Sequence, residues 1–176
     1  MRKSTIRRVV SRYSKKEVRR AGETIASPVS GDAEKADAAT VINYWRSLHR
    51  YPLQCLFDDL DSVLDDAPGY GIAGRIKKFD TIRDKLSRKN NISNLAAMYD
   101  VAGCRIVVPD LRAQHEVCQT LYQIPACDTD WSNRHNYIAS PKDSGYRGRH
   151  LLFRYPCPDC DYSLAIELQV RTERQH

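Results

Sequence analysis

The segment from Tyr162 to Arg171 alternates between apolar and polar side chains, and this alternation constrains the fold more than any other part of the chain. The apolar set is Leu164, Ile166, Leu168 and Val170. Successive side chains of a β-strand point to opposite faces of the sheet, so Glu167, Gln169 and Arg171 share the other face. The pattern predicts a strand with one buried face. Its polar face is either the solvated side of an antiparallel sheet or one wall of a binding site.

Other segments predict the elements around this strand. Further strands are expected at residues 72–77, 104–108, 136–139 and 150–155. Apolar residues recur at helical spacing from Asp32 as far as Tyr51-Pro52, which predicts a helix there. A second helix is predicted to carry the apolar stripe Leu53, Leu56, Phe57, Leu60, Val63 and Leu64. Aspartates fall mostly off that stripe, where we expect a solvated face: Asp58, Asp59, Asp61, Asp65 and Asp66. Together these elements predict an α+β fold, a mixed β-sheet flanked by helices.

Shorter helices and turns are predicted from capping residues. Asp80 and Ser93 are each placed to cap a short helix, the second one running through Met98. Asp110 is expected to cap a helix with an inward-facing stripe of Leu111, Val117, Leu121 and Ile124. Pro68-Gly69-Tyr70-Gly71 is typical of a turn.

The N-terminal segment differs from the rest because it is strongly basic. A helix over the first twenty residues would end at Gly22, and Gly22 to Gly31 resembles a linker. This divides the chain into a basic arm with its linker at 1–31 and one domain at 32–176. The arm is either solvated or faces RNA or a protein partner.

Composition restricts the class of protein. The 176 residues, 41% of them hydrophobic, can build one real core. No apolar run approaches the roughly 20 residues that cross a bilayer, and no signal peptide begins the chain, so we expect no membrane partner and a cytoplasmic location. The net charge of +6 favours anionic partners such as nucleotides or RNA. The six cysteines are expected to be reduced, and Cys157-Pro-Asp-Cys160 is interpreted as a tight hairpin turn rather than a zinc site.

Cations and carboxylates recur at positions where strands would present them together. Arg75 and Lys77 are two residues apart, which would direct both to one side of a strand and suits phosphate oxygens. Asp100 precedes the strand at 104–108, and with Glu167 it supplies two carboxylates from different strands. Such a pair can hold Mg²⁺ against a triphosphate. The loop at 141–147 adds Gly145 and Tyr146, where a backbone can approach a ligand and a base can stack.

Five short motifs, in their order, resemble the synthetase domain of the RelA/SpoT family. They are Arg75-Ile-Lys77 with Thr81-Ile-Arg-Asp-Lys85; Tyr99-Asp100-Val-Ala-Gly-Cys-Arg105; Tyr137-Ile138 with Pro141-Lys142 and Gly145-Tyr146; His150; and Glu167-Leu-Gln169-Val-Arg171-Thr172. The sequence has no P-loop or dinucleotide-binding glycine motif. The resemblance implies a nucleotidyltransferase-like fold and transfer of pyrophosphate from ATP to the 3′ hydroxyl of GDP or GTP, which makes the alarmone (p)ppGpp.

Roles follow from the resemblance position by position. Asp100 and Glu167 would be the catalytic pair. Asp100 would bind Mg²⁺, and Glu167 would be either a second ligand of this Mg²⁺ or the general base. ATP would be bound by Arg75, Lys77, Lys85 and Arg105. The acceptor would be bound by Tyr146, Lys142, His150 and Gln169, with Tyr146 stacking on guanine. Two protein partners stay open, because the sequence does not show whether the chain forms a homo-oligomer or pairs with an antitoxin.

The sequence departs from the family pattern at several positions. Asn136 replaces a usual aspartate, and Gly148-Arg149 replaces a more usual Ser-Leu, so Arg149 is expected to influence the choice of acceptor. No His-Asp dipeptide marks a hydrolase half, and the chain stops after His176 where the family continues into a helix. Two alternatives stay open: a toxic relative that pyrophosphorylates the 3′ end of tRNA or makes another alarmone, and a silent regulatory module with the same fold.

Overall fold

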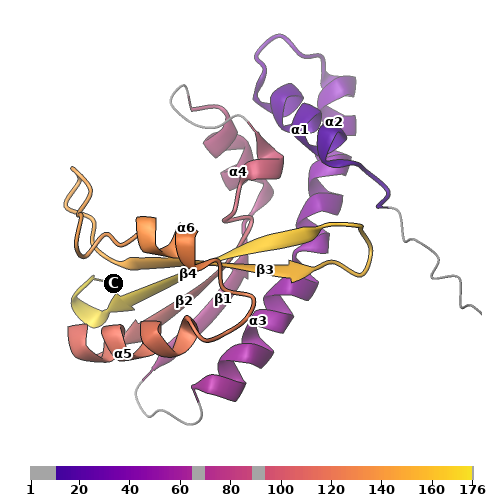
Figure 1. The fold of residues 1–176 in the computed structure, drawn as a ribbon. Coiled ribbons are helices and arrows are strands. Elements are labelled where there is room, and N and C mark those ends of the chain that lie inside the picture. The colour runs from indigo at the N-terminus through magenta and orange to yellow at the C-terminus, as the bar shows by residue number, and fades with distance from the viewer. Residues whose placement is uncertain (1–10, 65–69, 89–93, 176) are drawn as a thin grey trace, which may run out of the picture.

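The computed structural model describes residues 11–64, 70–88 and 94–175, in which a four-stranded sheet is combined with helices (Figure 1). The helices are α1 (Lys15–Ala26), α2 (Asp32–Leu48), α3 (Arg50–Val63), α4 (Phe79–Leu86), α5 (Leu111–Leu121) and α6 (Thr129–Arg134), with short 3₁₀ turns η1 (Leu95–Ala97) and η2 (Glu173–Gln175). The strands are β1 (Gly71–Ile76), β2 (Ala102–Val108), β3 (Arg149–Pro156) and β4 (Ser163–Thr172). Apart from the 136–139 strand, the predicted strands are present.

The sheet is mixed, as predicted, with the strand order β1-β2-β4-β3. β2 runs parallel to β4, while β1 pairs antiparallel with β2 and β3 pairs antiparallel with β4. β4 therefore lies in the interior of the sheet with a neighbour on each side. This placement fits its near-continuous burial, and it puts the polar residues of β4 at the centre of one face.

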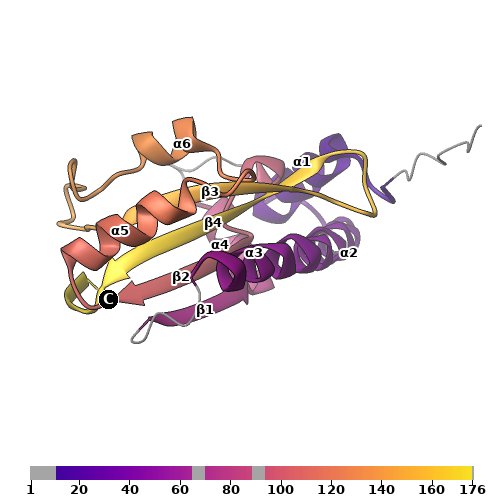
Figure 2. The same cartoon turned by 60° about the horizontal axis from the view of Figure 1, so that its bottom comes forward.

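One face of the sheet packs on α3 and α5 to form the main hydrophobic core (Figure 2). Of the aliphatic residues predicted for the buried side of β4, Ile166, Leu168 and Val170 are in this core and are fully buried, while Leu164 is buried in the second core. α3 contributes Leu56 and Leu60 from its predicted stripe. Gly74 is required on this face, because a Cβ there would lie 2.7 Å from the ring of Phe57. The sheet and α3 thus meet at close range under β1.

A second core joins α1, α2, α4 and η1 at one end of the sheet, next to the turn between β3 and β4 (Figure 1). α1 begins with a capping box, in which Ser14 and Glu17 each bond the other's backbone N–H. Its apolar stripe is buried there: Val18, Ala21 and Ile25. α1 does not end at Gly22 as expected but continues to Ala26, because Gly22 is packed against Leu95 at a distance that leaves no room for a side chain.

Residues 11–26 are thus folded onto the same body as α2, which differs from the expected arm and linker over 1–31. The hydrophobic stripe of α1 provides the physical reason, since it is buried only when the helix packs on a neighbour. Arg7 and Arg8 of the basic N-terminal segment lie outside the described residues. Lys16 and Arg20 lie on the exposed side of α1.

The outer edge of β3 is covered by α6 and the irregular segments beside it. Asp128 donates its backbone N–H to the carbonyl of Leu152, and the hydroxyl of Ser132 accepts from the N–H of Leu152. The strand expected at 136–139 is absent from this edge. Only Asn136 forms a bridge to Arg149, and its side chain accepts from the backbone N–H groups of residues 138 and 139, which turns the chain.

Several smaller expectations are confirmed and others are corrected. Asp110 caps α5 as predicted, but Leu111 is 56% exposed because it lies at the first position of the helix, before the inward stripe begins. α4 starts two residues earlier than expected, with Lys78 at its N-cap, so Asp80 lies in its first turn instead of capping it. Asp59 does not lie on a solvated face, since it accepts a 2.6 Å hydrogen bond from Tyr155. Cys157 forms the expected turn with Cys160.

The remaining expectations fall on parts of the chain that are not described. The described residues do not include Ser93, Asp65, Asp66, Pro68 and Gly69.

All cysteines in the described segments are free thiols. None of the helices described is both long enough and apolar enough to cross a membrane.

Candidate active site

The polar stripe of β4 forms the centre of the candidate site, because strand register aligns it with residues of the neighbouring strands. Glu167 lies beside Gly103 of β2, which in turn lies beside Arg75 of β1. One step along, Gln169 lies between Arg105 on β2 and His150 on β3. Residues of one row project on the same face, so the sheet itself brings these side chains together.

A pocket of about 360 Å³ opens over this face of β1, β2 and β4. Five predicted site residues line it: Arg75, Asp100, Arg105, Glu167 and Gln169. The space arises from small residues. Gly103 has no side chain between Arg75 and Glu167, and β1 contributes Gly71 and Ala73 on the same side. This stretch therefore leaves a hollow of nucleotide-compatible size where a larger side chain would fill it.

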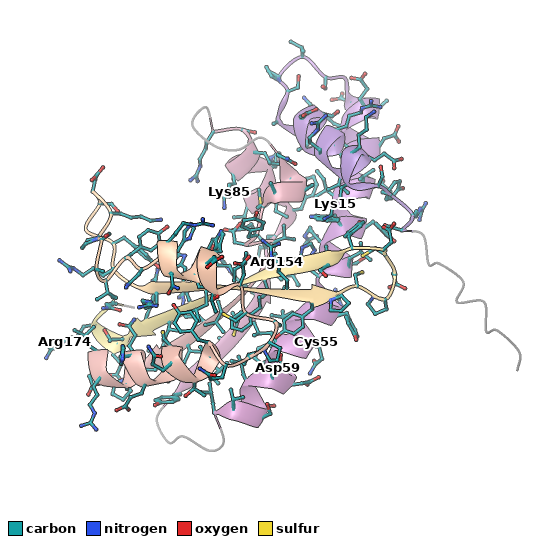
Figure 3. The ribbon with its side chains drawn as sticks, viewed as in Figure 1. Lys15, Cys55, Asp59, Lys85, Arg154 and Arg174 are labelled. Carbon is teal, nitrogen blue, oxygen red and sulfur yellow. The ribbon has the colours of Figure 1, made fainter. Side chains whose placement is uncertain are left out.

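Asp100 is held by two lysines at one end of the pocket. Lys85 of α4 donates to both carboxylate oxygens at 2.8 Å, and the Nζ atom of Lys77 lies 3.0 Å from Oδ2. Burial acts to raise the pKa of Asp100, but the hydrogen bonds and charges of the two lysines outweigh it, so the pKa is lowered. Asp100 is therefore ionised at neutral pH. Figure 3 marks Lys85 on α4, outside the sheet.

Glu167 is more deeply placed, with a side chain only 15% exposed. Its Oε1 atom lies 3.2 Å from Nδ1 of His150 and accepts a 3.0 Å hydrogen bond from the amide of Gln169. Burial raises the pKa of Glu167 and the charge of Asp100 also raises it, but the interactions with His150 and Gln169 outweigh both, and the net shift is downward. Glu167 is thus a buried, ionised carboxylate near a second carboxylate.

Tyr146 connects the loop at 141–147 to this cluster. Its hydroxyl lies 2.6 Å from Nε2 of His150 and accepts a 3.1 Å hydrogen bond from Nε of Arg171. Lys142 lies over the rings of Tyr137 and Tyr146, with its Nζ atom 4.3 Å and 5.3 Å from their centroids. Gly145, between them, has a φ of +77°, a conformation that favours glycine. This turn returns the chain so that the ring of Tyr146 faces His150.

Three arginines from three strands gather on the same face. The pKa of Arg105 is lowered, first by burial and then by the positive charges of Arg171 and Arg75. Like charges at this spacing repel one another, and an anion between them would relieve the repulsion. The cluster is therefore suited to a ligand carrying several negative charges.

All ten predicted site residues consequently belong to one connected site. Those that do not line the pocket join it through a partner: Lys77 and Lys85 through Asp100, His150 through Glu167, Tyr146 through His150, and Lys142 through the ring of Tyr146. Arg149 is different. It alternates with His150 and so points to the opposite face, where it donates to the hydroxyl of Tyr122, and the expectation that it influences the acceptor is wrong.

Some residues of the site were not predicted from the sequence. Arg171 stood on the polar stripe and in a matching motif but received no role, although its alternation with Glu167 was the available signal. Arg46 of α2 donates from Nε to the backbone carbonyl of Lys77 at 2.9 Å and so fixes the position of that lysine. It has no sequence signal, because the two residues come from separate helical and strand segments.

The two carboxylates fit a magnesium ion by their chemistry. Mg²⁺ prefers oxygen ligands and is usually held by one or two carboxylates together with phosphate oxygens of the substrate. Asp100 and Glu167 supply two ionised carboxylates at one pocket. Within the described residues no group of three or more acidic, histidine or cysteine side chains converges, so a metal here would take its other ligands from substrate and water.

Known proteins resemble this chain in sequence and in fold. The family model described as "Region found in RelA / SpoT proteins" matches residues 74–176. GTP pyrophosphokinase YjbM of Bacillus subtilis is 31% identical over 114 residues, which cover 61% of this chain and 52% of that protein. The chain thus spans about half the length of this curated relative.

Solved structures show the same fold. The crystal structure of small alarmone synthetase 2 from Bacillus subtilis matches with a TM-score of 0.58 and 24% identity, covering 74% of this chain and 72% of that one. Small alarmone synthetase 1 from the same organism, bound to its product pppGpp, matches with a TM-score of 0.55 and 24% identity, covering 80% and 74%. The matched family region contains the second half of β1 and all of β2, β3 and β4, together with every residue of the site described above except Arg46, Gly71 and Ala73. The chain therefore belongs to the RelA/SpoT family.

Proposed function

We propose that this protein transfers the β,γ-pyrophosphate of ATP to the 3′ hydroxyl of GDP or GTP and so makes (p)ppGpp. The observation that carries the proposal is the pocket that holds two ionised carboxylates beside a group of cations. Its relatives support the choice of reaction, since one is named a GTP pyrophosphokinase and another holds pppGpp as its product.

In the proposed step the 3′ oxygen of the acceptor attacks the β-phosphorus of ATP. A new bond forms between that oxygen and the β-phosphorus, the bond from the β-phosphorus to the bridging oxygen on the α-phosphate breaks, and AMP leaves. Glu167 accepts the hydroxyl proton. Its lowered pKa keeps it ionised and ready at neutral pH, and general base catalysis of this kind contributes about 10²–10⁴-fold.

The cations of the site would bind the triphosphate. Arg75 and Arg105 line the pocket and can each form two parallel hydrogen bonds to phosphate oxygens. Lys77 and Lys85 neutralise Asp100 when no substrate is present and can shift toward phosphate oxygens on binding. Phosphoryl transfer is catalysed mainly by positioning and charge stabilisation, so a cluster of this composition is suited to it.

The acceptor would lie on the side of the pocket formed by Tyr146. A guanine base can stack on the ring of Tyr146 near Lys142, with His150 and Gln169 toward the ribose. The side-chain carbonyl of Gln169 supports this arrangement, because it is buried and lacks a hydrogen-bond partner among the described residues. A hydroxyl of the acceptor ribose would satisfy it.

A magnesium ion would be held by Asp100 and Glu167. When bound it would neutralise charge on the triphosphate and orient it for in-line attack. Binding can be measured without turnover, through the Mg²⁺-dependent rise in thermal stability that a ligand of the folded state produces. We expect this rise to be lost in Asp100→Asn and kept in Asp84→Asn, a change on the exposed face of α4. An equal rise in both variants would contradict the assignment.

A second acceptor, the 3′ end of tRNA, is favoured by the exposed cations of α1. Lys16 and Arg20 lie one helical turn apart on its exposed side. Contacts of such cations with phosphates add affinity that falls with salt. Neutralising both residues to Gln would then weaken transfer to tRNA in a salt-dependent manner and leave transfer to GDP unchanged. Another alarmone product and a silent regulatory role are the remaining alternatives.

The deciding experiment offers γ-labelled ATP and Mg²⁺ to the purified protein with GDP, GTP, ATP or bulk tRNA as separate acceptors. We expect label on GDP or GTP, loss of transfer in Glu167→Gln with ATP binding nearly intact, and normal transfer in Glu116→Gln. Glu116 is a matched control because it is an exposed residue of α5, on the opposite side of the sheet. Label on tRNA alone would favour the second acceptor, and no label on any acceptor would contradict the proposal.

A further inference from the structure

Four side chains of the site form one chain of hydrogen bonds that runs across the polar face. Arg171 donates from Nε to the hydroxyl of Tyr146 at 3.1 Å, and that hydroxyl lies 2.6 Å from Nε2 of His150. The other ring nitrogen of His150 lies 3.2 Å from Oε1 of Glu167. The chain therefore links the residue proposed to stack on the acceptor with the residue proposed to take its proton.

The chemistry of the end groups fixes the direction of these bonds. An ionised carboxylate only accepts, so Nδ1 of His150 must carry the hydrogen that faces Glu167. In the neutral imidazole Nε2 then accepts, and the Tyr146 hydroxyl must donate to it. That hydroxyl keeps a lone pair for the N–H of Arg171. Each group thus has one role, and consecutive hydrogen bonds of the same sense strengthen one another.

The consequence for Glu167 is an asymmetric carboxylate. His150 and Gln169 both approach Oε1, and no hydrogen bond from the described residues reaches Oε2. The carboxylate is consequently held through one oxygen while the other stays available for the acceptor hydroxyl or a metal. His150 is itself buried, with a side chain 10% exposed, so water competes poorly for these bonds.

We propose that His150 is a positioning residue that ties the acceptor-stacking ring of Tyr146 to the carboxylate of Glu167. It orients Glu167 through Nδ1 and Tyr146 through Nε2, so the Tyr146 hydroxyl supports catalysis separately from the ring that stacks. This inference rests on the proposed function, because it concerns the same acceptor and the same base. It changes the expected role of His150 from an acceptor contact to an orienting group.

The hydroxyl and the ring of Tyr146 can be tested separately. Tyr146→Phe keeps the stacking surface and removes only the donor to His150. We expect kcat to fall about tenfold, the usual scale for one lost hydrogen bond, while KM for the acceptor changes less than about twofold. If the hydroxyl has no such role, the Phe variant will match the wild type. Tyr155→Phe is the control, since it removes a hydroxyl from the opposite face of β3 and should leave kcat unchanged.

A double-mutant cycle tests whether the effect passes through His150. In His150→Asn the amide can replace Nδ1 as a donor to Glu167, but nothing replaces Nε2. We expect Tyr146→Phe to cost less than about twofold in kcat in that background, because the connection is already broken. If the fold-loss of kcat in the double variant equals the product of the fold-losses in the two single variants, the inference is overturned.

Nitrogen NMR of the His150 ring, without substrates, separates this inference from the proposed function. The neutral ring of the wild type should carry its hydrogen on Nδ1 and none on Nε2, and the Nε2 resonance should shift in Tyr146→Phe. Hydrogen on Nε2 alone would overturn the inference even in an active enzyme. A protein with the predicted tautomer and shift but no transfer activity would retain the hydrogen-bond chain and refute the proposed function instead.

Discussion

Replacement of Asp100 by Asn should destabilise the protein even before any substrate is considered. Asp100 is the anion shared by Lys77 and Lys85, and the Lys77 side chain is only 6% exposed. In the variant this buried ammonium loses its counter-charge. Removing one partner of a buried pair costs about 3–5 kcal/mol. Asp100 is a quarter exposed and Asn keeps one acceptor oxygen, so we expect about 2–3 kcal/mol.

Lys85 adds little to this figure. Its side chain is 35% exposed, and an ammonium with access to water loses little when its partner is neutralised. For a chain of this size 1 kcal/mol corresponds to about 2–4 °C in Tm, so the variant should melt about 4–12 °C below the wild type. Urea unfolding should show a lower midpoint with an unchanged slope, since the folded surface stays the same.

Two comparisons make the result specific. Asp84→Asn removes an exposed carboxylate of α4 that lies 3.4 Å from Arg83, and we expect it to change stability by less than about 0.5 kcal/mol. Adding Lys77→Met to Asp100→Asn should restore part of the loss, because an apolar side chain needs no counter-charge. The reasoning is refuted if Asp100→Asn melts no lower than Asp84→Asn.

The pH dependence has a defined sign. The folded state lowers the pKa of Asp100, so its stabilisation is present above the unfolded pKa of about 4 and is lost as the pH falls through the folded pKa. The stability difference between wild type and Asp100→Asn should therefore shrink below about pH 4. A difference that stays constant in acid would mean that the carboxylate charge is not its source.

Two further predictions concern the cores. Gly74→Ala should cost about 1–3 kcal/mol because its Cβ would lie 2.7 Å from Phe57, whereas Gly71→Ala in the same strand meets its nearest neighbour at 3.8 Å and should unfold like the wild type; equal melting of the two would contradict this packing. His49 is buried against Trp45 with its pKa lowered to about 4, so stability should fall by roughly 3 kcal/mol as the pH drops from about 6.5 toward 4. His49→Leu should flatten the curve between pH 6.5 and 5, and an unchanged slope would place the titrating group elsewhere.

Much of the sheet was predictable because it depends on local alternation. The period of two in β4 correctly assigned the buried residues Ile166, Leu168 and Val170 and the polar face of Glu167, Gln169 and Arg171, whereas in β3 residues 150–153 are all buried. Asp110 was recognised as a helix cap because an aspartate just before a helix can accept a hydrogen bond from the backbone three residues later. In the structure it accepts this bond from Ala113. Such signals lie within a few residues of one another and need no knowledge of tertiary contacts.

Other features depended on contacts that cannot be inferred from the spacing of residues in the sequence. Asn136 turned a short apolar segment away from a strand by bonding its own backbone. Gly22 stayed inside a helix because a side chain at this position would clash with Leu95, whose Cβ lies 2.9 Å from where a Cβ of residue 22 would be. α6 is short, and its apolar residue Trp131 gave no helical period.

The candidate site was predictable in composition and less so in its connections. The family motifs named ten residues that the structure brings together, five of them lining the pocket, and alternation explained why Glu167 and Gln169 share a face. Neither could indicate that His150 bonds Glu167 on one side and Tyr146 on the other, because that depends on the path of the 141–147 loop. The direction of Arg149 could have been predicted from its alternation with His150.

The leaving nucleotide tests the central claim most directly. The pocket is proposed to transfer the β,γ-pyrophosphate as one unit, so each acceptor modified should release one AMP. Phosphorus NMR of a reaction containing ATP and GDP should show AMP and a nucleotide with a 3′ diphosphate appearing in equal amounts, and Glu167→Gln should stop both. Release of ADP with a single phosphate on the acceptor, or hydrolysis of ATP without any acceptor product, would contradict the account.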